Sequence, residues 1–295
     1  MKPGPIFAFG EVLWDCLPSG IFLGGAPVNV AYHLHRLGGN VWPVSAVGAD
    51  FLGEEILRRL RGWGLPVSYV SIIPGALTGA VIAGIDASGS ATYDFRNDAA
   101  WDRIGVSRGL LEEAETASVI IFGTLAFREK PNREALAQLL AASPNSIKVC
   151  DINLRPPFDD MELAESLMRQ ADLIKLNDAE LIRLAGGEKA NLETMARELS
   201  SKQNGPSVCV TAGAQGAGLL WNGEWYWSPG RPVVVKDTVG AGDSFLAALV
   251  CGLLVAGQEP AVALARACRL GEFVASCNGA TPAYRATDDG GFAAI

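Results

Sequence analysis

The sequence of 295 residues contains only two histidines, His33 and His35, and both fall in one helical pattern. Zinc sites and serine–histidine catalytic sites commonly use histidine, so this shortage argues against both kinds of site. The six cysteines form no Cys-x-x-Cys pair, and most of them have apolar neighbours. They are typical of reduced thiols in a protein core, and we expect a cytoplasmic protein.

Long apolar runs and clusters of positive charge are also absent. The longest apolar run, residues 245–256, is too short to span a membrane and contains Gly252, so it predicts a buried helix. The N-terminus does not match the pattern of a signal peptide, and we expect no membrane partner. The formal net charge is −8 with no run of Lys or Arg, so we expect no nucleic-acid partner.

Two widespread nucleotide-binding motifs are missing. No segment reads G-x-x-x-x-G-K-[ST], which excludes a P-loop NTPase. The glycines at 213, 216 and 218 do not have the G-x-G-x-x-G spacing of a dinucleotide-binding fold. A nicotinamide-dependent dehydrogenase therefore remains only a remote alternative.

Strand-like and helical patterns alternate along most of the chain. We expect strands at residues 6–9, 41–47, 118–122, 148–152, 172–176 and 208–211. The clearest helical patterns lie at residues 27–37, 51–61, 131–142, 162–170, 192–200, 244–256 and 261–276. This alternation predicts an α/β fold with a mostly parallel sheet, and apolar strands such as the one at 208–211 predict that helices cover both faces.

One stretch breaks this alternation. Residues 78–85 and 91–95 flank a turn-rich segment and predict a β-hairpin, which could form a small sheet with the segment near residues 14–22. We treat residues 1–295 as one domain with this flap, formed by about 12–23 and 75–100, inserted in it. The flap would either close over a substrate or pair with a second copy in a homodimer. Residues 288–295 are expected to be a loose tail.

Residues 237–243 combine small residues with acids. They read Asp-Thr-Val-Gly-Ala-Gly-Asp, and the apolar run of a predicted helix follows at once. The first N–H groups of a helix have no intrahelical partner and attract anions, while Gly240 and Gly242 permit close approach. A carboxylate here would repel an anion unless it accepts a proton, although a first-turn acid would also suit a plain helix start. We therefore expect phosphoryl transfer, with Asp243 as the base and Gly240, Ala241 and Gly242 as the anion site.

A second segment supports this interpretation. Residues 24–31 read Gly-Gly-Ala-Pro-Val-Asn-Val-Ala, and Gly38 and Gly48 follow. This spacing resembles the N-terminal signature of the PfkB, or ribokinase-like, carbohydrate kinase family, and residues 237–243 resemble its C-terminal signature. The matches are about two hundred residues apart, and the resemblance extends over about residues 6–282. It implies a three-layer α/β/α fold with a mostly parallel sheet and a small β-sheet lid.

The resemblance also suggests where a sugar would bind. Gly25 lets a ligand approach the backbone, and Asn29 offers the donor and the acceptor that a hydroxyl group needs. Asp15 lies in a Gly-Glu-x-x-x-Asp segment similar to that of the family's fructokinases, which implies an acceptor for two sugar hydroxyls. Arg96, at the end of the flap strand, and Arg155, in an Asn-Leu-Arg-Pro-Pro string, could reach the sugar or the phosphates.

The nucleotide and metal sites are implied by the same family. The residues expected to bind ATP follow apolar strands or lie near the end of the chain: Asn153, Asn177, Thr211, Gly213, Gly216 and Asn278. Glu180 lies in an Asn-x-x-Glu motif that implies hydrated Mg²⁺, and the same spacing is that of an ordinary capping box, with which it is compatible. Asp237 implies a monovalent cation such as K⁺, although Ala283 stands where some relatives offer a hydroxyl group.

The predicted reaction is ATP-dependent phosphorylation of a sugar hydroxyl, with the 6-hydroxyl of fructose as the preferred acceptor and Asp243 as the base. A 2-keto-3-deoxygluconate kinase would instead use Arg155 or Arg96 to hold a carboxylate, which Asp15 disfavours. Ribose and nucleosides are further alternatives within the family. A non-catalytic sugar-binding relative would be expected to have damaged motifs, and here both Gly-Ala-Gly-Asp and Asn-x-x-Glu are intact.

Overall fold

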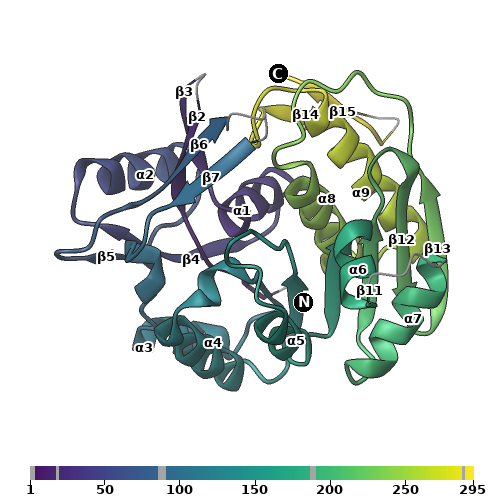
Figure 1. Ribbon diagram of the computed structural model, residues 1–295, viewed down its shortest axis with the longest axis horizontal. Helices are drawn as coiled ribbons and strands as arrows, with labels where there is room; N and C mark the ends of the chain where they lie inside the picture. The colour runs from purple at the N-terminus through teal and green to yellow at the C-terminus, as the bar shows by residue number, and fades with distance from the viewer. Residues whose placement is uncertain (1–3, 18–19, 86–90, 187–190, 288–289) are drawn as a thin grey trace.

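The computed structural model describes residues 4–17, 20–85, 91–186, 191–287 and 290–295 (Figure 1). A nine-stranded sheet forms its centre. The strands lie in the spatial order β13 (Glu224–Pro229), β12 (Gly216–Trp221), β11 (Ser207–Thr211), β10 (Leu173–Asn177), β9 (Ile147–Asp151), β8 (Val119–Phe122), β1 (Ile6–Phe9), β4 (Val41–Gly48) and β5 (Val70–Ile73). All neighbours from β11 to β5 pair in parallel, whereas β12 and β13 are antiparallel additions at one edge.

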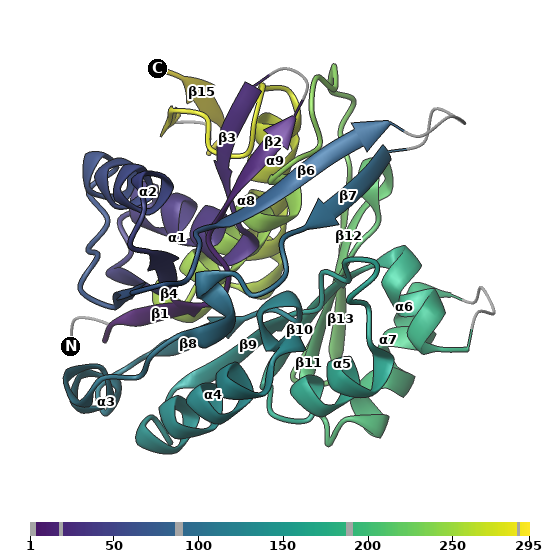
Figure 2. The ribbon, with the colours of Figure 1, turned by 60° about the vertical axis from the view of Figure 1, so that its left-hand side comes forward.

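Helices cover both faces of this sheet (Figure 2). The first face packs against α1 (Ala26–Arg36), α2 (Phe51–Gly62), α8 (Ala241–Leu249) and α9 (Pro260–Ala275). The second packs against α3 (Arg108–Ala114), α4 (Lys130–Ala142), α5 (Met161–Met168), α6 (Asp178–Leu184) and α7 (Leu192–Lys202). Within β8, Val119 and Ile121 join the first core while Ile120 and Phe122 join the second, as side chains alternate along a strand. The predicted three-layer α/β/α fold is confirmed.

The regular elements largely match the sequence patterns. Each of the predicted strands is present to within one residue at either end, and most predicted helices are present to within two. The exception is the helix expected at 244–256, because α8 starts earlier, at Ala241, and continues from Val250 to Val255 as a π-helix. The short strand β5 and the glycine- and tryptophan-containing strands β12 and β13 were not predicted, since none has the long apolar pattern of a central strand.

The predicted flap is a separate four-stranded sheet, which we call the lid. Its strands lie in the order β3 (Gly20–Gly24), β2 (Leu13–Leu17), β6 (Gly79–Ile85) and β7 (Ala91–Phe95). Trp14 on one face packs toward α2, where its ring nitrogen donates to the carbonyl of Leu52 (3.1 Å). Asp15 therefore lies on the opposite face, paired in register with Phe22 and Val81.

The expectation of a loose C-terminal tail was wrong in its final part. Residues 288 and 289 lie outside the described part of the chain, but β15 (Phe292–Ala294) pairs antiparallel with β14 (Tyr284–Ala286). Phe292 also packs edge-on against Tyr284, with ring centroids 5.5 Å apart. Three-residue strands carry too little periodicity to be recognised in the sequence. Among the described helices, none combines the length and the apolar character that crossing a membrane would need.

Candidate active site

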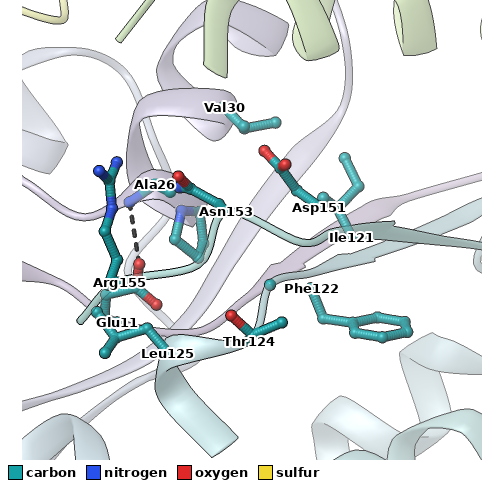
Figure 3. Close-up of a pocket in the computed structure, with 12 residues that line it drawn as sticks. Glu11, Ala26, Val30, Ile121, Phe122, Thr124, Leu125, Asp151, Asn153 and Arg155 are labelled. Carbon is teal, nitrogen blue, oxygen red and sulfur yellow. Dashed lines mark hydrogen bonds between the residues drawn. The ribbon is translucent and has the colours of Figure 1, made fainter. Parts of the chain in front are cut away.

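Several of the residues singled out in the sequence lie at the carboxyl ends of the parallel strands. Segments leaving β1, β9, β10 and β11 meet there, and the amino end of α8 faces them from the first helical layer. Open α/β sheets commonly bind ligands at this edge. A small pocket lies here between the segments after β1, β8 and β9 (Figure 3), lined among others by Glu11, Thr124, Asp151, Asn153 and Arg155.

The start of α8 has the geometry of an anion site. Gly240 is the N-cap with a φ of 76°, and a Cβ there would lie 2.6 Å from the Cα of Ala280, so only glycine fits. The N–H groups of Gly242 and Asp243 lie in the first turn, where no intrahelical acceptor exists. The N–H of Ala241 instead donates to the carbonyl of Thr238 (3.3 Å). The glycine loop expected before the helix is present, with the N–H of Ala241 already bonded within the chain, and its role as an anion site stays a prediction.

Asp243 is buried beside this loop. Its Oδ2 accepts a hydrogen bond from Nδ2 of Asn29 (2.8 Å), which joins two residues 214 positions apart. Burial, followed by the nearby charge of Asp151, raises the pKa of Asp243 to about 6, against the opposing effects of Asn29, Lys175 and Arg155. The carboxylate is therefore mostly ionised at pH 7 and close enough to neutrality to exchange protons readily.

A buried ion pair beneath the anion loop was not assigned from the sequence. Nζ of Lys175 lies 3.0 and 3.2 Å from the two carboxylate oxygens of Asp151, and both side chains are less than a tenth exposed. A Cβ on Gly242 would lie 3.1 Å from the same Nζ. Burial opposes the charge of Lys175, but the surrounding carboxylates outweigh it and raise the lysine pKa. The sequence carried a signal for this pair, because Asp151 ends an apolar strand and Lys175 interrupts the apolar pattern of the neighbouring one.

Two further carboxylates approach the site from the lid side. Glu11 is buried, its Oε1 accepts from the N–H of Ala26 (3.2 Å), and burial raises its pKa to about 7. Burial also raises the pKa of Asp15 to about 6. Gly24 and Gly25 make room for them: a Cβ at Gly24 would overlap the Asp15 carboxylate, and one at Gly25 would collide with the carbonyl of Glu11. The Gly-Gly pair thus permits close packing as well as ligand approach.

The two arginines have different surroundings. Arg155 is exposed, but its charge lowers the pKa values of Glu11, Asp15 and Asp243 together, which places it near all three carboxylates. Arg96 is also exposed, and its charge acts on Asp50 at the start of α2. Its backbone carbonyl accepts a hydrogen bond from Nη2 of the buried Arg128 (2.8 Å). The structure brings Arg155 into the candidate site more closely than Arg96.

Asn177 and Glu180 form the capping box allowed by their spacing. Oδ1 of Asn177 accepts from the N–H of Glu180, and Oε2 of Glu180 accepts from the N–H of Asn177, both at 2.8 Å. Oε1 of Glu180 also accepts from the N–H of Leu154 (2.8 Å), which ties α6 to the segment carrying Asn153. Each carboxylate oxygen keeps a further lone pair. Such a carboxylate suits a hydrated Mg²⁺, which keeps several waters and needs few protein ligands.

The remaining predicted nucleotide residues lie at or after the ends of β11 and α9. Thr211 ends β11, and Gly213 and Gly216 follow in the turn to β12 with φ values of 52° and 114°. Asn278 is exposed near the end of α9. Among the described residues, no three His, Cys, Asp or Glu side chains form a group able to hold a metal ion by themselves.

Asp237 links the anion loop to the segment after α9. Its Oδ1 accepts from the N–H of Val239 (3.0 Å) and its Oδ2 from the N–H of Gly279 (3.1 Å). Both carboxylate oxygens are therefore already used to shape the loop, each with a lone pair left. Ala283 has no hydroxyl group that could serve as a further ligand for a cation. An oxygen-rich monovalent cation site at Asp237 is compatible with this donor set but would need further backbone carbonyls.

Comparisons with known proteins identify the family of this chain. Residues 20–286 match the model of the pfkB family carbohydrate kinases. The chain is 29% identical to a fructokinase of Klebsiella pneumoniae, covering 97% of this chain and 98% of that protein, and 32% identical to a fructokinase of Solanum tuberosum, covering 85% and 81%. Its fold superposes on the crystal structure of a Vibrio cholerae O395 fructokinase bound to fructose, ADP and a calcium ion, with a TM-score of 0.81, 22% identity and 94% of each chain covered.

The two glycine-containing segments, the hydrogen bond that joins Asn29 of one to Asp243 of the other, and the match over residues 20–286 lead to one conclusion. The chain belongs to the pfkB family of carbohydrate kinases and is a phosphotransferase with an alcohol group as acceptor.

Proposed function

We propose that this enzyme transfers the γ-phosphate of ATP to the 6-hydroxyl of fructose. The observation that carries the proposal is the 2.8 Å hydrogen bond between Asn29 and Asp243. It places a residue suited to bind a sugar hydroxyl directly beside a buried carboxylate at an anion-binding helix start. The fructokinase relatives support fructose as the sugar.

Asp243 would accept the proton of the hydroxyl group as its oxygen attacks the γ-phosphorus. The first-turn N–H groups of Gly242 and Asp243, with Gly240 and Ala241 shaping the loop, would stabilise the charge on the transferred group. Lys175 would add a positive charge from beneath the loop. General-base assistance of this kind typically contributes about 10²–10⁴-fold in rate.

We assign the nucleotide to the residues that follow the strands on the other side of the loop: Asn153, Asn177, Thr211, Gly213, Gly216 and Asn278. Mg²⁺, held through water by Glu180, would neutralise charge on the phosphates when bound. K⁺ at Asp237 is a weaker assignment, because Asp237 already accepts two backbone hydrogen bonds. A potassium ion is present in a structure of the Vibrio cholerae fructokinase double mutant.

The charges of the sugar side favour a neutral substrate. Glu11, Asp15 and Asp243 are three carboxylates, and Arg155 is the cation whose charge acts on all of them. We assign Asp15, Gly25, Asn29 and Arg155 to the sugar. Arg96 would join them only if the lid brought it inward. A substrate carboxylate would face repulsion here, which disfavours 2-keto-3-deoxygluconate.

A coupled assay of ADP release tests the proposal. Purified enzyme with ATP and Mg²⁺ is offered fructose, 2-keto-3-deoxygluconate, ribose and adenosine in turn. We expect the highest kcat/KM with fructose. Fastest turnover of 2-keto-3-deoxygluconate would instead show that Arg155 holds a carboxylate. No ADP release with any of the four would contradict the proposal and favour a different sugar or a non-catalytic role.

We further propose that residues 1–295 act as one kinase domain, with the lid inserted in it, and that two copies associate through the lid. Cys16 pairs in register with Ile21 on β3 and with Ile82 on β6, so the three side chains lie on one face. Ile21 is 57% and Ile82 59% exposed, which leaves an apolar row for a second copy to cover. The cytoplasmic location expected from the cysteine pattern stays a prediction.

A further inference from the structure

Helix α1 reaches the nucleotide side of the site as well as the sugar side. Asn29 and His33 are four residues apart, so their side chains lie on the same face of the helix. Asn29 binds Asp243 at the start of α8. One turn later, His33 contacts residues 280–284, the segment that packs against the anion loop at Gly240. The proposed reaction leaves His33 without a role.

The His33 ring is fully buried and uses both of its nitrogens. Nε2 lies 2.9 Å from the carbonyl oxygen of Ala280, and Nδ1 lies 3.1 Å from the hydroxyl of Tyr284. A carbonyl oxygen can only accept, so the partners assign the proton to Nε2, and Nδ1 accepts from Tyr284. Burial lowers the pKa of His33 to about 4, which keeps the ring neutral at pH 7, as this arrangement needs.

Neighbouring side chains of α1 hold the same segment. The Tyr32 hydroxyl donates to the carbonyl of Pro282 (2.9 Å), and the Arg36 guanidinium donates to the carbonyl of Tyr284. Alternate carbonyls of the segment are thus bound to one helix. Because Ala280 packs so closely against Gly240 that no Cβ fits between them, a shift of the segment would also displace the anion loop.

We propose that His33 is a positioning residue that couples sugar binding to nucleotide binding through Ala280 and Gly240. The inference rests on the proposed function. A sugar that orders α1 through Asn29 would fix Ala280 against the anion loop and so strengthen nucleotide binding. Linkage then requires the nucleotide to strengthen sugar binding by the same factor.

The chain offers a matched control, because its other histidine lies on the same helix. His35 packs against Gly64, away from residues 280–284. We would measure the Kd of ADP by calorimetry with and without saturating fructose, in the wild type, His33→Phe and His35→Phe. If the ADP-release assay gives the highest kcat/KM with another sugar, the calorimetry uses that sugar in place of fructose. We expect fructose to lower the Kd by about 5–150-fold in the wild type and His35→Phe, as typical couplings do, and by a factor near one in His33→Phe.

Two milder variants keep the test decisive if His33→Phe does not fold, as judged by circular dichroism. Tyr284→Phe removes one hydrogen bond and should reduce the factor in part, whereas His33→Gln keeps a donor for Ala280 and should restore part of it. A factor of one in the wild type, or equal factors in the wild type and all folded variants of His33 and Tyr284, would overturn the inference. If the enzyme phosphorylates a sugar but the variants show the same coupling as the wild type, only the role of His33 is contradicted. If no sugar leads to ADP release, the proposed function itself is contradicted.

Discussion

Burial decides the protonation of single carboxylates in this site. Asp243, Asp15 and Glu11 all have pKa values raised by desolvation, to about 6, 6 and 7, and Arg155 opposes the shift in each case. Three acids that ionise only near neutrality make a site able to exchange protons with a hydroxyl group. The side chain of Asn29 holds one oxygen of the Asp243 carboxylate, whereas the backbone N–H of Ala26 holds one oxygen of Glu11.

Asp243→Asn removes the proposed base while keeping the size of the side chain. We expect kcat to fall at least about a hundredfold, because an amide cannot accept the hydroxyl proton. ADP binding, measured by calorimetry, should stay close to that of the wild type, since the first-turn N–H groups remain. Turnover near the wild-type value would remove Asp243 from its assigned role.

Glu11→Gln should change stability in a pH-dependent way. Burial raises the pKa of Glu11 in the folded protein to about 7, above its ordinary 4.5. Between pH 4.5 and 7 the folded state therefore keeps a proton that the unfolded state has lost, and the folded state becomes less stable as the pH rises through this range. Glutamine mimics the neutral acid and keeps an acceptor for Ala26. We expect the variant to gain about 2–3 kcal/mol in the free energy of unfolding at pH 8 and almost nothing at pH 4. Urea unfolding at both pH values measures this, and an equal gain at both would contradict it.

At the scale of elements, the lid is tied to the main sheet by short polar contacts at its base. Asp50 caps α2 through the N–H of Gly53 (2.8 Å), and its carboxylate also accepts from the N–H (2.8 Å) and the hydroxyl (2.6 Å) of Thr78. Thr78 directly precedes lid strand β6. One side chain therefore sets both the start of a helix and the entry of the chain into the lid.

Asp50→Ala and Asn191→Ala form a matched pair of cap removals. Asn191 caps α7 in the other helical layer, where its side chain accepts from the N–H groups of Glu193 and Thr194. Each variant should lose about 0.5–2 kcal/mol of stability, as lost caps typically do. Only Asp50→Ala should also raise the KM for the sugar, because only it loosens Thr78. Steady-state kinetics and urea unfolding decide this, and equal KM values in the two variants would show that Asp50 acts only as a cap.

At the scale of the whole molecule, two exposed apolar side chains among the described lid residues lie where a second copy could cover them. Ile21 and Ile82 lie on the lid face away from Asp15, so an association through them would leave the sugar side of the lid open. Burying such a row removes apolar surface from water and costs no active-site contact. The lid would then be part of an interface and of a substrate site at the same time.

Ile82→Lys tests the association. A charge in the middle of an apolar contact should convert dimers to monomers, as measured by light scattering coupled to size-exclusion chromatography. Val262→Lys, at a residue of α9 that is 56% exposed, is the control and should leave the mass unchanged. A wild-type protein that is monomeric at all concentrations tested would contradict the proposed dimer.

Much of this architecture could be predicted from local patterns. Strand and helix positions follow from apolar periodicity, and the loop before α8 follows from Gly240 and Gly242, although the helix starts three residues before its predicted start. The ion pair of Lys175 and Asp151 was not predicted, because it depends on the register that places the two residues side by side on neighbouring strands. The hairpin of β14 and β15 was missed for a similar reason, since three residues carry no usable period.

The sequence by itself determined the layer architecture, the β-hairpin of the lid and the glycine loop before Asp243, because each follows from a local pattern in the chain. Only the tertiary structure decided that Asn29 binds Asp243, that Lys175 pairs with Asp151 beneath the loop, and that α1 holds residues 280–284 through His33. These contacts join residues far apart in the chain, and their strength depends on burial that only packing creates. The raised pKa values of Asp243 and Glu11 were also decided only by the tertiary structure, since they come from desolvation in the folded molecule.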